Sequence, residues 1–193
     1  MNPRTKAVVI WLVTLTTFTL VVGLAAAEFR SRQTQGVLGF SVADYQAEAE
    51  NQQGSAADFT LPSLKGGRLI TLSSFRGYVT VVNFWGSWCA PCRIEAPGLE
   101  QAWEDYRTRG VRFLGVDERD DDAAGRAFVS EFHLGYPSVT DPSGRLAAPY
   151  GLFGMPTTFV IDAKGQLRYR FVGYLNADIL RSTLDTMLRG STG

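Results

Sequence analysis

The chain has 193 residues, of which 45% are apolar and 20% are charged, a composition typical of one globular domain with accessory segments. Its 19 basic and 19 acidic side chains cancel, and no cluster of Lys and Arg occurs, which argues against nucleic-acid binding. Two cysteines and one histidine are too few for a structural zinc site, which needs about four such ligands, so the cysteines are better interpreted as a redox pair.

The N-terminal segment is apolar. Residues 7–27 contain no charged side chain, and a helix of that length spans roughly 31 Å, close to the roughly 30 Å hydrocarbon core of a bilayer. Arg4 and Lys6 precede it, as expected if residues 1–6 stay in the cytoplasm. The alternative is a signal sequence cleaved near Ala25-Ala26-Ala27, but signal h-regions run only about 7–15 residues. We expect a single-pass anchor at 7–27, and both interpretations place the remaining chain outside the cytoplasm.

The next stretch, residues 28–54, has little apolar periodicity and is rich in Gln, Glu and Ala toward its end. This composition is typical of a linker, so we expect a tether here and a folded domain at 55–193.

The folded domain shows both strand and helix patterns. Short alternating runs predict a hairpin, continuous β-branched runs predict buried strands, and apolar residues at helical spacing predict helices. The expected strands are residues 58–62, 68–72, 78–84, 111–116, 157–161 and 167–172, and the expected helical segments are 73–76, 90–109, 120–133 and 176–188. The order β-β-α-β-α-β-β-α predicts an α/β fold with parallel pairing around the cysteines.

The two cysteines lie where the first long strand meets its helix, in the sequence Cys89-Ala90-Pro91-Cys92. At a helix N-terminus the first sulfur lies near unsatisfied backbone N–H groups and the positive end of the helix dipole. This environment lowers the thiol pKa below its free value of roughly 8.5 and favours the thiolate, the species that attacks disulfides. We therefore expect Cys89 to be the nucleophile and Cys92 the resolving thiol. A structural disulfide across so short a loop would stabilise little.

The motif Val82-Asn83-Phe84-Trp85-Gly86-Ser87-Trp88-Cys89-Ala90-Pro91-Cys92-Arg93 resembles the active-site region of thioredoxin-fold proteins. The closest branch is the membrane-anchored TlpA/ResA/CcmG-like thiol–disulfide reductases. Residues 58–62 with 72–77 resemble its N-terminal hairpin extension, Glu95 and Pro97 resemble its helix continuation, and residues 154–162 are similar to its second signature. The resemblance covers roughly residues 56–189 and implies a thioredoxin-like domain with a central mixed sheet flanked by helices.

The resemblance also implies roles for particular residues. Pro156 would be a cis-proline facing the sulfurs, and the backbone of Met155 would pair with an extended substrate peptide. Pro97 would kink the active-site helix. The full set expected to contact substrate is Trp88, Pro91, Met155, Pro156 and Thr157.

Glu95 is the third expected catalytic residue. Thioredoxin has a buried Asp beneath the cysteine pair, whereas this chain has Asn83, which cannot take up a proton. Glu95 is the matching acid in the tethered branch, and we hypothesise that it accepts the proton of Cys92. The alternative is a solvated carboxylate on an exposed helix face.

Other polar residues are given no chemistry. His133 is interpreted as a surface or capping residue, and Asp117 with Asp120-Asp121-Asp122 as loop and helix-start residues. We expect no metal and no cofactor other than the redox-active disulfide Cys89–Cys92.

An oxidant of this fold stabilises its reduced form, and Ala90-Pro91 supplies no charge to do so, so we expect a reductase working in an oxidising compartment. Its partners would be a membrane thiol–disulfide electron donor and an oxidised protein, by resemblance the haem site of apocytochrome c during cytochrome c maturation. A general extracytoplasmic disulfide reductase would look much the same. A peroxiredoxin-like peroxidase would need Thr or Ser at Gly86. A redox-inert tethered adaptor is disfavoured by the intact Cys89, Cys92 and Pro156.

Overall fold

The computed structural model describes Asn2, Trp11, Thr16, Thr17, Thr19, Gly23 and residues 49–190. The chain separates into two units, residues 1–44 and 45–193, and the strands and helices below belong to the second. Within the described residues, none of the helices has both the length and the apolar character needed to cross a membrane. The anchor expected at 7–27 and most of the expected linker lie outside the described residues, apart from the few residues named above.

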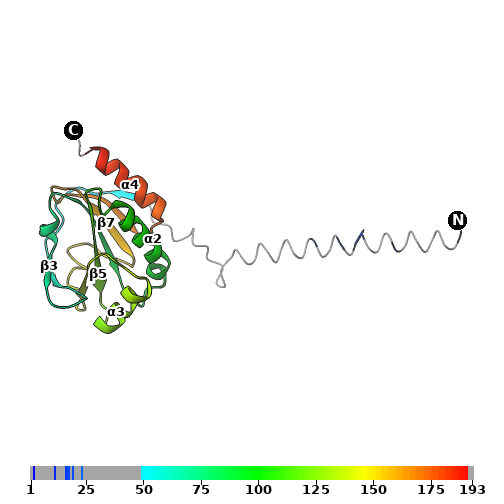
Figure 1. The fold of residues 1–193 in the computed structure, drawn as a ribbon, viewed down its shortest axis with the longest axis horizontal. Helices are drawn as coiled ribbons and strands as arrows, with labels where there is room; N and C mark the ends of the chain where they lie inside the picture. Colours follow the sequence, from blue (N-terminus) through cyan, green and yellow to red (C-terminus); the bar gives the residue numbers. More distant parts are fainter. Residues whose placement is uncertain are drawn as a thin grey trace. The chain divides into compact units, whose positions relative to one another are not determined.

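The second unit contains eight strands, three α-helices and one short 3-10 helix among its described residues (Figure 1). In chain order these are β1 (Ala49–Asn51), β2 (Thr60–Pro62), β3 (Leu69–Thr71), η2 (Leu72–Phe75), β4 (Val79–Trp85), α2 (Ala90–Tyr106), β5 (Val111–Glu118), α3 (Asp122–Glu131), β6 (Ser138–Asp141), β7 (Thr157–Ile161), β8 (Leu167–Val172) and α4 (Ala177–Gly190).

Six of the strands form one mixed sheet in the order β1-β8-β7-β4-β5-β6. β4, β5 and β6 are parallel, whereas β7 is antiparallel to both β4 and β8. The expected α/β architecture with parallel pairing around the cysteines is therefore confirmed. β2 and β3 form a separate antiparallel hairpin, which matches the expected N-terminal extension.

Two strands were not anticipated. β1 lies inside the stretch expected to be linker, yet it pairs antiparallel with β8, so the sheet begins before the expected domain start. β6 adds a parallel edge strand beside β5. Both are too short, at three and four residues, to show the periodicity from which strands are predicted.

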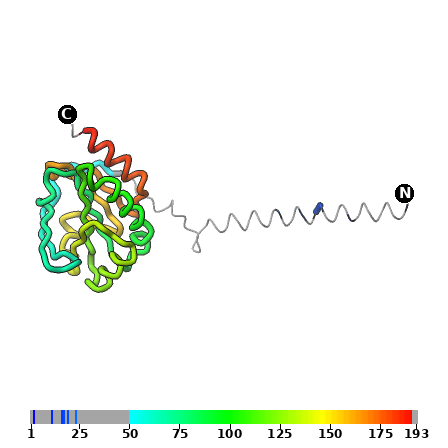
Figure 2. The backbone as a smooth tube through the Cα atoms, in the orientation of Figure 1, coloured from blue at the N-terminus to red at the C-terminus, as the bar shows by residue number. Residues whose placement is uncertain are grey.

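The sheet separates two apolar layers. On one face α2 and α4 pack against β4 and β5, as the ribbon and the tube both show (Figures 1 and 2). The other face is covered by the β2–β3 hairpin and by residues 146–152. Every residue of β4 is buried, which explains why most of its side chains are apolar. The cysteines follow β4 directly, so this central strand fixes their position.

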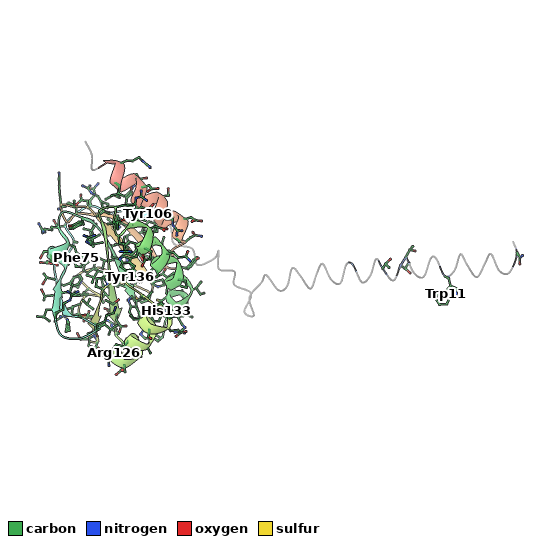
Figure 3. The ribbon with its side chains drawn as sticks, in the orientation of Figure 1. Trp11, Phe75, Tyr106, Arg126, His133 and Tyr136 are labelled. Carbon is green, nitrogen blue, oxygen red and sulfur yellow. A yellow bond between two sulfur atoms is a disulfide. The ribbon has the colours of Figure 1, made fainter. Side chains whose placement is uncertain are left out.

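Helix α4 is joined to α2 by polar contacts as well as apolar ones. Tyr106 Oη donates to the Asp185 carboxylate at 2.8 Å and to the carbonyl of Arg181 at 3.1 Å. Figure 3 shows Tyr106 beside α4. Asn176 begins α4 as expected, since its Oδ1 accepts the N–H of Asp178 at 2.7 Å.

Candidate active site

Cys89 and Cys92 form a disulfide at the start of α2, with an S–S distance of 2.02 Å and a Cα–Cα distance of 5.3 Å. Cys89 is the N-cap residue of the helix, and its sulfur accepts the N–H of Cys92 at 3.2 Å. Both cysteines are buried in the apolar layer on the face of the sheet that α2 and α4 cover. The structure thus brings together the predicted pair, with Cys89 at the positive end of the helix dipole.

Helix α2 begins at this point for local reasons. Cys89 has an extended backbone, and Pro91 occupies the first turn, where its missing N–H leaves no bond unmade. The half-buried Pro91 lies between the two sulfurs in sequence. Pro97 lies inside the helix, as expected, and the helix continues past it to Tyr106.

The loop before β7 contains the second predicted motif. The Met155–Pro156 peptide bond is cis, which confirms that expectation. Pro156 is buried, and Met155 is half-buried against both apolar layers. Thr157 is fully buried and its hydroxyl donates to the carbonyl of Gly154 at 2.8 Å. Its side chain therefore shapes the loop from within, and Thr157 itself lies in β7 between β4 and β8.

The two tryptophans before the pair differ in environment. Trp88 is 58% exposed, and its indole lies so close to Gly86 that a Cβ there would come within 2.6 Å of its Nε1. Trp85 is buried and stacks on Phe128 with ring centroids 4.4 Å apart. Trp88 can therefore contact a partner at the surface, whereas Trp85 is part of the core.

Glu95 lies one helical turn beyond Cys92 and is only 2% exposed. One carboxylate oxygen accepts the Asn83 Nδ2 hydrogen bond at 2.8 Å, and the other accepts the N–H of Leu175 at 2.9 Å. The alternative of a solvated surface carboxylate is therefore wrong. Burial raises the pKa of Glu95 to about 8, because the two hydrogen bonds offset only part of the lost hydration.

Asn83 connects this carboxyl to the sheet. Its Nδ2 also donates to Thr158 Oγ1 on β7 at 2.9 Å, so it fixes the carboxylate from the strand beneath the helix. The buried acid of this site comes from α2, on the same helix as the cysteines.

One part of the site was not anticipated. Asp117, at the end of β5, is completely buried, and Asp120 Oδ2 accepts the N–H of Ser87 at 2.5 Å, two residues before Cys89. The prediction that these aspartates are loop and helix-start residues is correct for Asp120, Asp121 and Asp122, whereas Asp117 lies within β5. Asp121 caps α3 by accepting the N–H of Ala123 at 2.8 Å. The sequence feature that could have indicated a close contact here is Gly125, a glycine inside the residues that form α3.

His133 follows the end of α3 with a φ of 53°, so it terminates the helix in the left-handed conformation. Its interpretation as a capping residue is confirmed, and Figure 3 shows it near this end of α3. In the described part of the chain, no group of three or more His, Cys, Asp or Glu side chains is arranged to hold a metal ion.

Comparisons with known proteins point to the same chemistry. A model of the AhpC/TSA family matches residues 53–170. The thiol:disulfide interchange protein DsbE of Pseudomonas fluorescens is 37% identical over 127 residues, which cover 65% of this chain and 69% of that protein. The thiol-disulfide oxidoreductase ResA of Bacillus cereus is 32% identical over 135 residues, which cover 68% and 78%.

A solved structure shares the fold. The secreted thiol-disulfide isomerase of Corynebacterium glutamicum superposes with a TM-score of 0.65 at 30% identity, covering 73% of this chain and 90% of that one. The central mixed sheet, the helix that begins at the cysteine pair and the cis-proline loop together make the thioredoxin-like arrangement.

Proposed function

Because this chain belongs to the AhpC/TSA family and is a thiol–disulfide oxidoreductase of the DsbE and ResA type, we propose that it reduces protein disulfides outside the cytoplasm. The proposal rests above all on the Cys89–Cys92 pair at the N-terminus of α2, with the buried Glu95 one turn away. This arrangement supplies a nucleophile, a resolving thiol and a proton acceptor.

The reaction starts from the reduced pair. The Cys89 thiolate attacks one sulfur of a substrate disulfide, the substrate S–S bond breaks, and the departing substrate sulfur takes up a proton. The resulting mixed disulfide joins Cys89 to the substrate. Cys92, once deprotonated, attacks the Cys89 sulfur, which re-forms the Cys89–Cys92 disulfide and releases the second substrate thiol. The substrate gains two electrons, and the pair loses two.

Glu95 is proposed as the acceptor of the Cys92 proton. A carboxyl group with a pKa of about 8 is close to matching a thiol, so proton transfer between them is nearly balanced. Glu95→Gln should slow release of the mixed disulfide by about tenfold or more, since general-base catalysis typically contributes at least that much. Glu104→Gln is the matched control, because Glu104 lies on the same helix and forms an exposed ion pair with Arg107. Equal release rates in the two variants would remove Glu95 from the mechanism.

Substrate peptides are proposed to bind across the cis-proline loop. Met155 and Pro156 would pair with an extended peptide through their backbone, and the exposed Trp88 with Pro91 would contact its side chains. Thr157, which is buried in β7 between β4 and β8, would support this loop through its hydroxyl bond to Gly154.

The proposed location follows from the N-terminal sequence. Residues 7–27 are proposed to anchor the chain in the membrane, with residues 1–6 in the cytoplasm and the thioredoxin-like domain on the outer or periplasmic face. In an oxidising compartment the pair must be reduced again by a membrane thiol–disulfide donor.

The proposed substrate is the oxidised Cys-X-X-Cys-His site of an apocytochrome c, on the basis of the resemblance to TlpA/ResA/CcmG-like reductases. Trapping tests this directly, because Cys92→Ser leaves the mixed disulfide on Cys89. Apocytochrome c on the trap would support a role in cytochrome c maturation. A range of unrelated secreted proteins would instead indicate a general disulfide reductase.

A peroxidase is the second candidate, because peroxiredoxins share the hairpin and the position of the first cysteine. The residue three positions before Cys89 is Gly86, which has no hydroxyl to offer a peroxide. Peroxide consumption by the reduced chain separates the two functions: rapid turnover would favour the peroxidase, and insulin reduction without peroxide turnover would favour the reductase.

A further inference from the structure

Asp117 is a buried carboxyl group with no ordinary partner. It is 0% exposed at the end of β5, opposite Trp85 of β4. Among the described residues, no N–H or O–H group donates a hydrogen bond to either of its oxygens. An ionised carboxylate without donors is expensive to bury, so the group is neutral or shares a proton.

A glycine in helix α3 makes room for the Asp117 side chain, although glycine disfavours the helix. Gly125 lies inside α3, where glycine is less favourable than alanine. A Cβ at Gly125 would lie 1.9 Å from Asp117 Oδ2. Helix α3 therefore packs directly over the Asp117 carboxyl group, and the glycine is explained by that contact.

The negative charge of the neighbouring Asp120 carboxylate acts on Asp117. Because both groups are carboxyls, a hydrogen bond between them requires that one of them carries a proton. Asp120 already accepts the N–H of Ser87 at 2.5 Å and the N–H of Asp121 at 2.8 Å. Two donors favour the ionised form of Asp120, so the proton belongs on Asp117.

The electrostatics agree with this assignment. Burial, followed by the negative charge of Asp120, raises the pKa of Asp117 to about 8. Burial acts to raise the pKa of Asp120 as well. The pKa of Asp120 is nevertheless below its usual range, because Asp120 has hydrogen bonds with Ser87, Asp121 and Asp117. The two pKa values move apart, as in a carboxyl pair that shares one proton.

We propose that protonated Asp117 is a positioning residue, which donates a hydrogen bond to the Asp120 carboxylate and thereby holds Ser87 and the loop Gly86–Trp88 that leads into Cys89.

The charged groups around Asp117 make its ionisation costly. From α3 it faces the carboxylates of Asp121 and Asp122, and Arg126 reaches Asp122 only at 4.0 Å. The hairpin side contributes the apolar Leu64 near Gly125. On the α2 side, Arg93 is already paired with Glu131 of α3. Loss of the Asp117 proton would therefore add a negative charge to a region that is already acidic.

This charge would be coupled to the cysteine pair. Asp120 contacts the backbone two residues before Cys89, so the carboxyl pair lies on the order of 10 Å from the nucleophilic sulfur. Ionised Asp117 opposes a thiolate on Cys89, and by reciprocity the thiolate opposes ionisation of Asp117. The reduced form of the wild-type chain should become less favourable above the pKa of Asp117.

The experiment is the thiol–disulfide equilibrium of the full-length chain with glutathione at pH about 6 and about 9.5, on either side of the Asp117 pKa. We expect Asp117→Asn to match the wild type at the lower pH. At the higher pH the variant should favour the reduced form by about threefold, the size expected for one charge at roughly 10 Å after salt screening. The same ratio at both pH values would overturn the proposal, because a purely structural defect does not depend on pH.

Glu104→Gln is the matched control. Glu104 lies on α2 with the cysteines, and its exposed carboxylate pairs with Arg107. Because solvent screens this exposed charge, the ratio of the variant to the wild type should be the same at both pH values.

A second measurement needs no folded variant. In the oxidised wild-type chain, the carboxyl carbon of Asp117 should titrate by NMR near pH 8, and the amide of Ser87 should shift with the same midpoint. Titration near pH 4, or a Ser87 amide that does not respond, would overturn the proposal. The first measurement tests exchange at Cys89–Cys92 and the second tests the loop before Cys89, so both stand even if the chain proves not to act as a reductase.

Discussion

Glu95→Gln is the substitution that most sharply tests how the site is built. Raising a carboxyl pKa from 4.5 to about 8 means that the folded chain binds the Glu95 proton more tightly than the unfolded chain. The stability that this provides is fully present below pH about 4.5 and is lost as the pH rises to about 8. At about 1.4 kcal/mol per pKa unit, the wild type loses about 5 kcal/mol across this window.

Gln cannot ionise, so the variant is spared this loss. It does lose one good hydrogen bond, because its amide has only one acceptor oxygen for the two N–H groups of Asn83 and Leu175. We therefore expect Glu95→Gln to be less stable than the wild type by about 1–2 kcal/mol at pH about 5. At pH about 9 the order should reverse, with the variant more stable by a few kcal/mol.

Urea denaturation of the oxidised full-length chains at the two pH values measures this difference. Comparing each variant with the wild type at the same pH removes the contributions of Asp117 and Glu118, whose pKa values are also raised. Exposed Glu104→Gln is the control, and its effect should be small and independent of pH. A Glu95→Gln difference that is the same at both pH values would refute a raised pKa at Glu95.

Three further substitutions test the local packing. Gly125→Ala should destabilise the chain by about 1–3 kcal/mol in urea denaturation, because the clash with Asp117 outweighs the gain in helix propensity; unchanged or increased stability would contradict this. Gly86→Ala should displace the exposed Trp88 indole at a cost of less than about 1 kcal/mol, which tryptophan fluorescence can follow; an unchanged emission spectrum would count against the contact. Asp121→Ala should cost about 1 kcal/mol through loss of the α3 N-cap, and a neutral thermal melt would argue against that capping role.

Much of the fold could be predicted because its main elements have strong patterns. β4 is largely apolar and β-branched, and α2 has helical spacing closed by glycine, so both were placed within a few residues. β1 has the sequence Ala-Glu-Asn, which has no strand preference, and it is a strand only because β8 offers an unpaired edge. Such a strand depends on tertiary structure and leaves no local signal.

The candidate site divides in the same way. Cys89, Cys92 and Pro156 belong to local motifs, so the sequence located them. The burial of Glu95 could not be decided locally, because it depends on the backbone of Leu175 closing over α2 from a segment 80 residues away. The contact of Asp120 with Ser87 spans 33 residues and was missed for the same reason.

The reduction potential of the Cys89–Cys92 pair tests the central proposal, a disulfide reductase, most directly. Equilibration of the full-length chain with glutathione or dithiothreitol at neutral pH gives this value. We expect a potential toward the reducing end of the range, near the about −270 mV of thioredoxin, because Ala90-Pro91 offers no charge to stabilise the reduced pair. A potential above roughly −150 mV, close to that of the strong oxidant DsbA, would contradict the proposal and make the chain an oxidant.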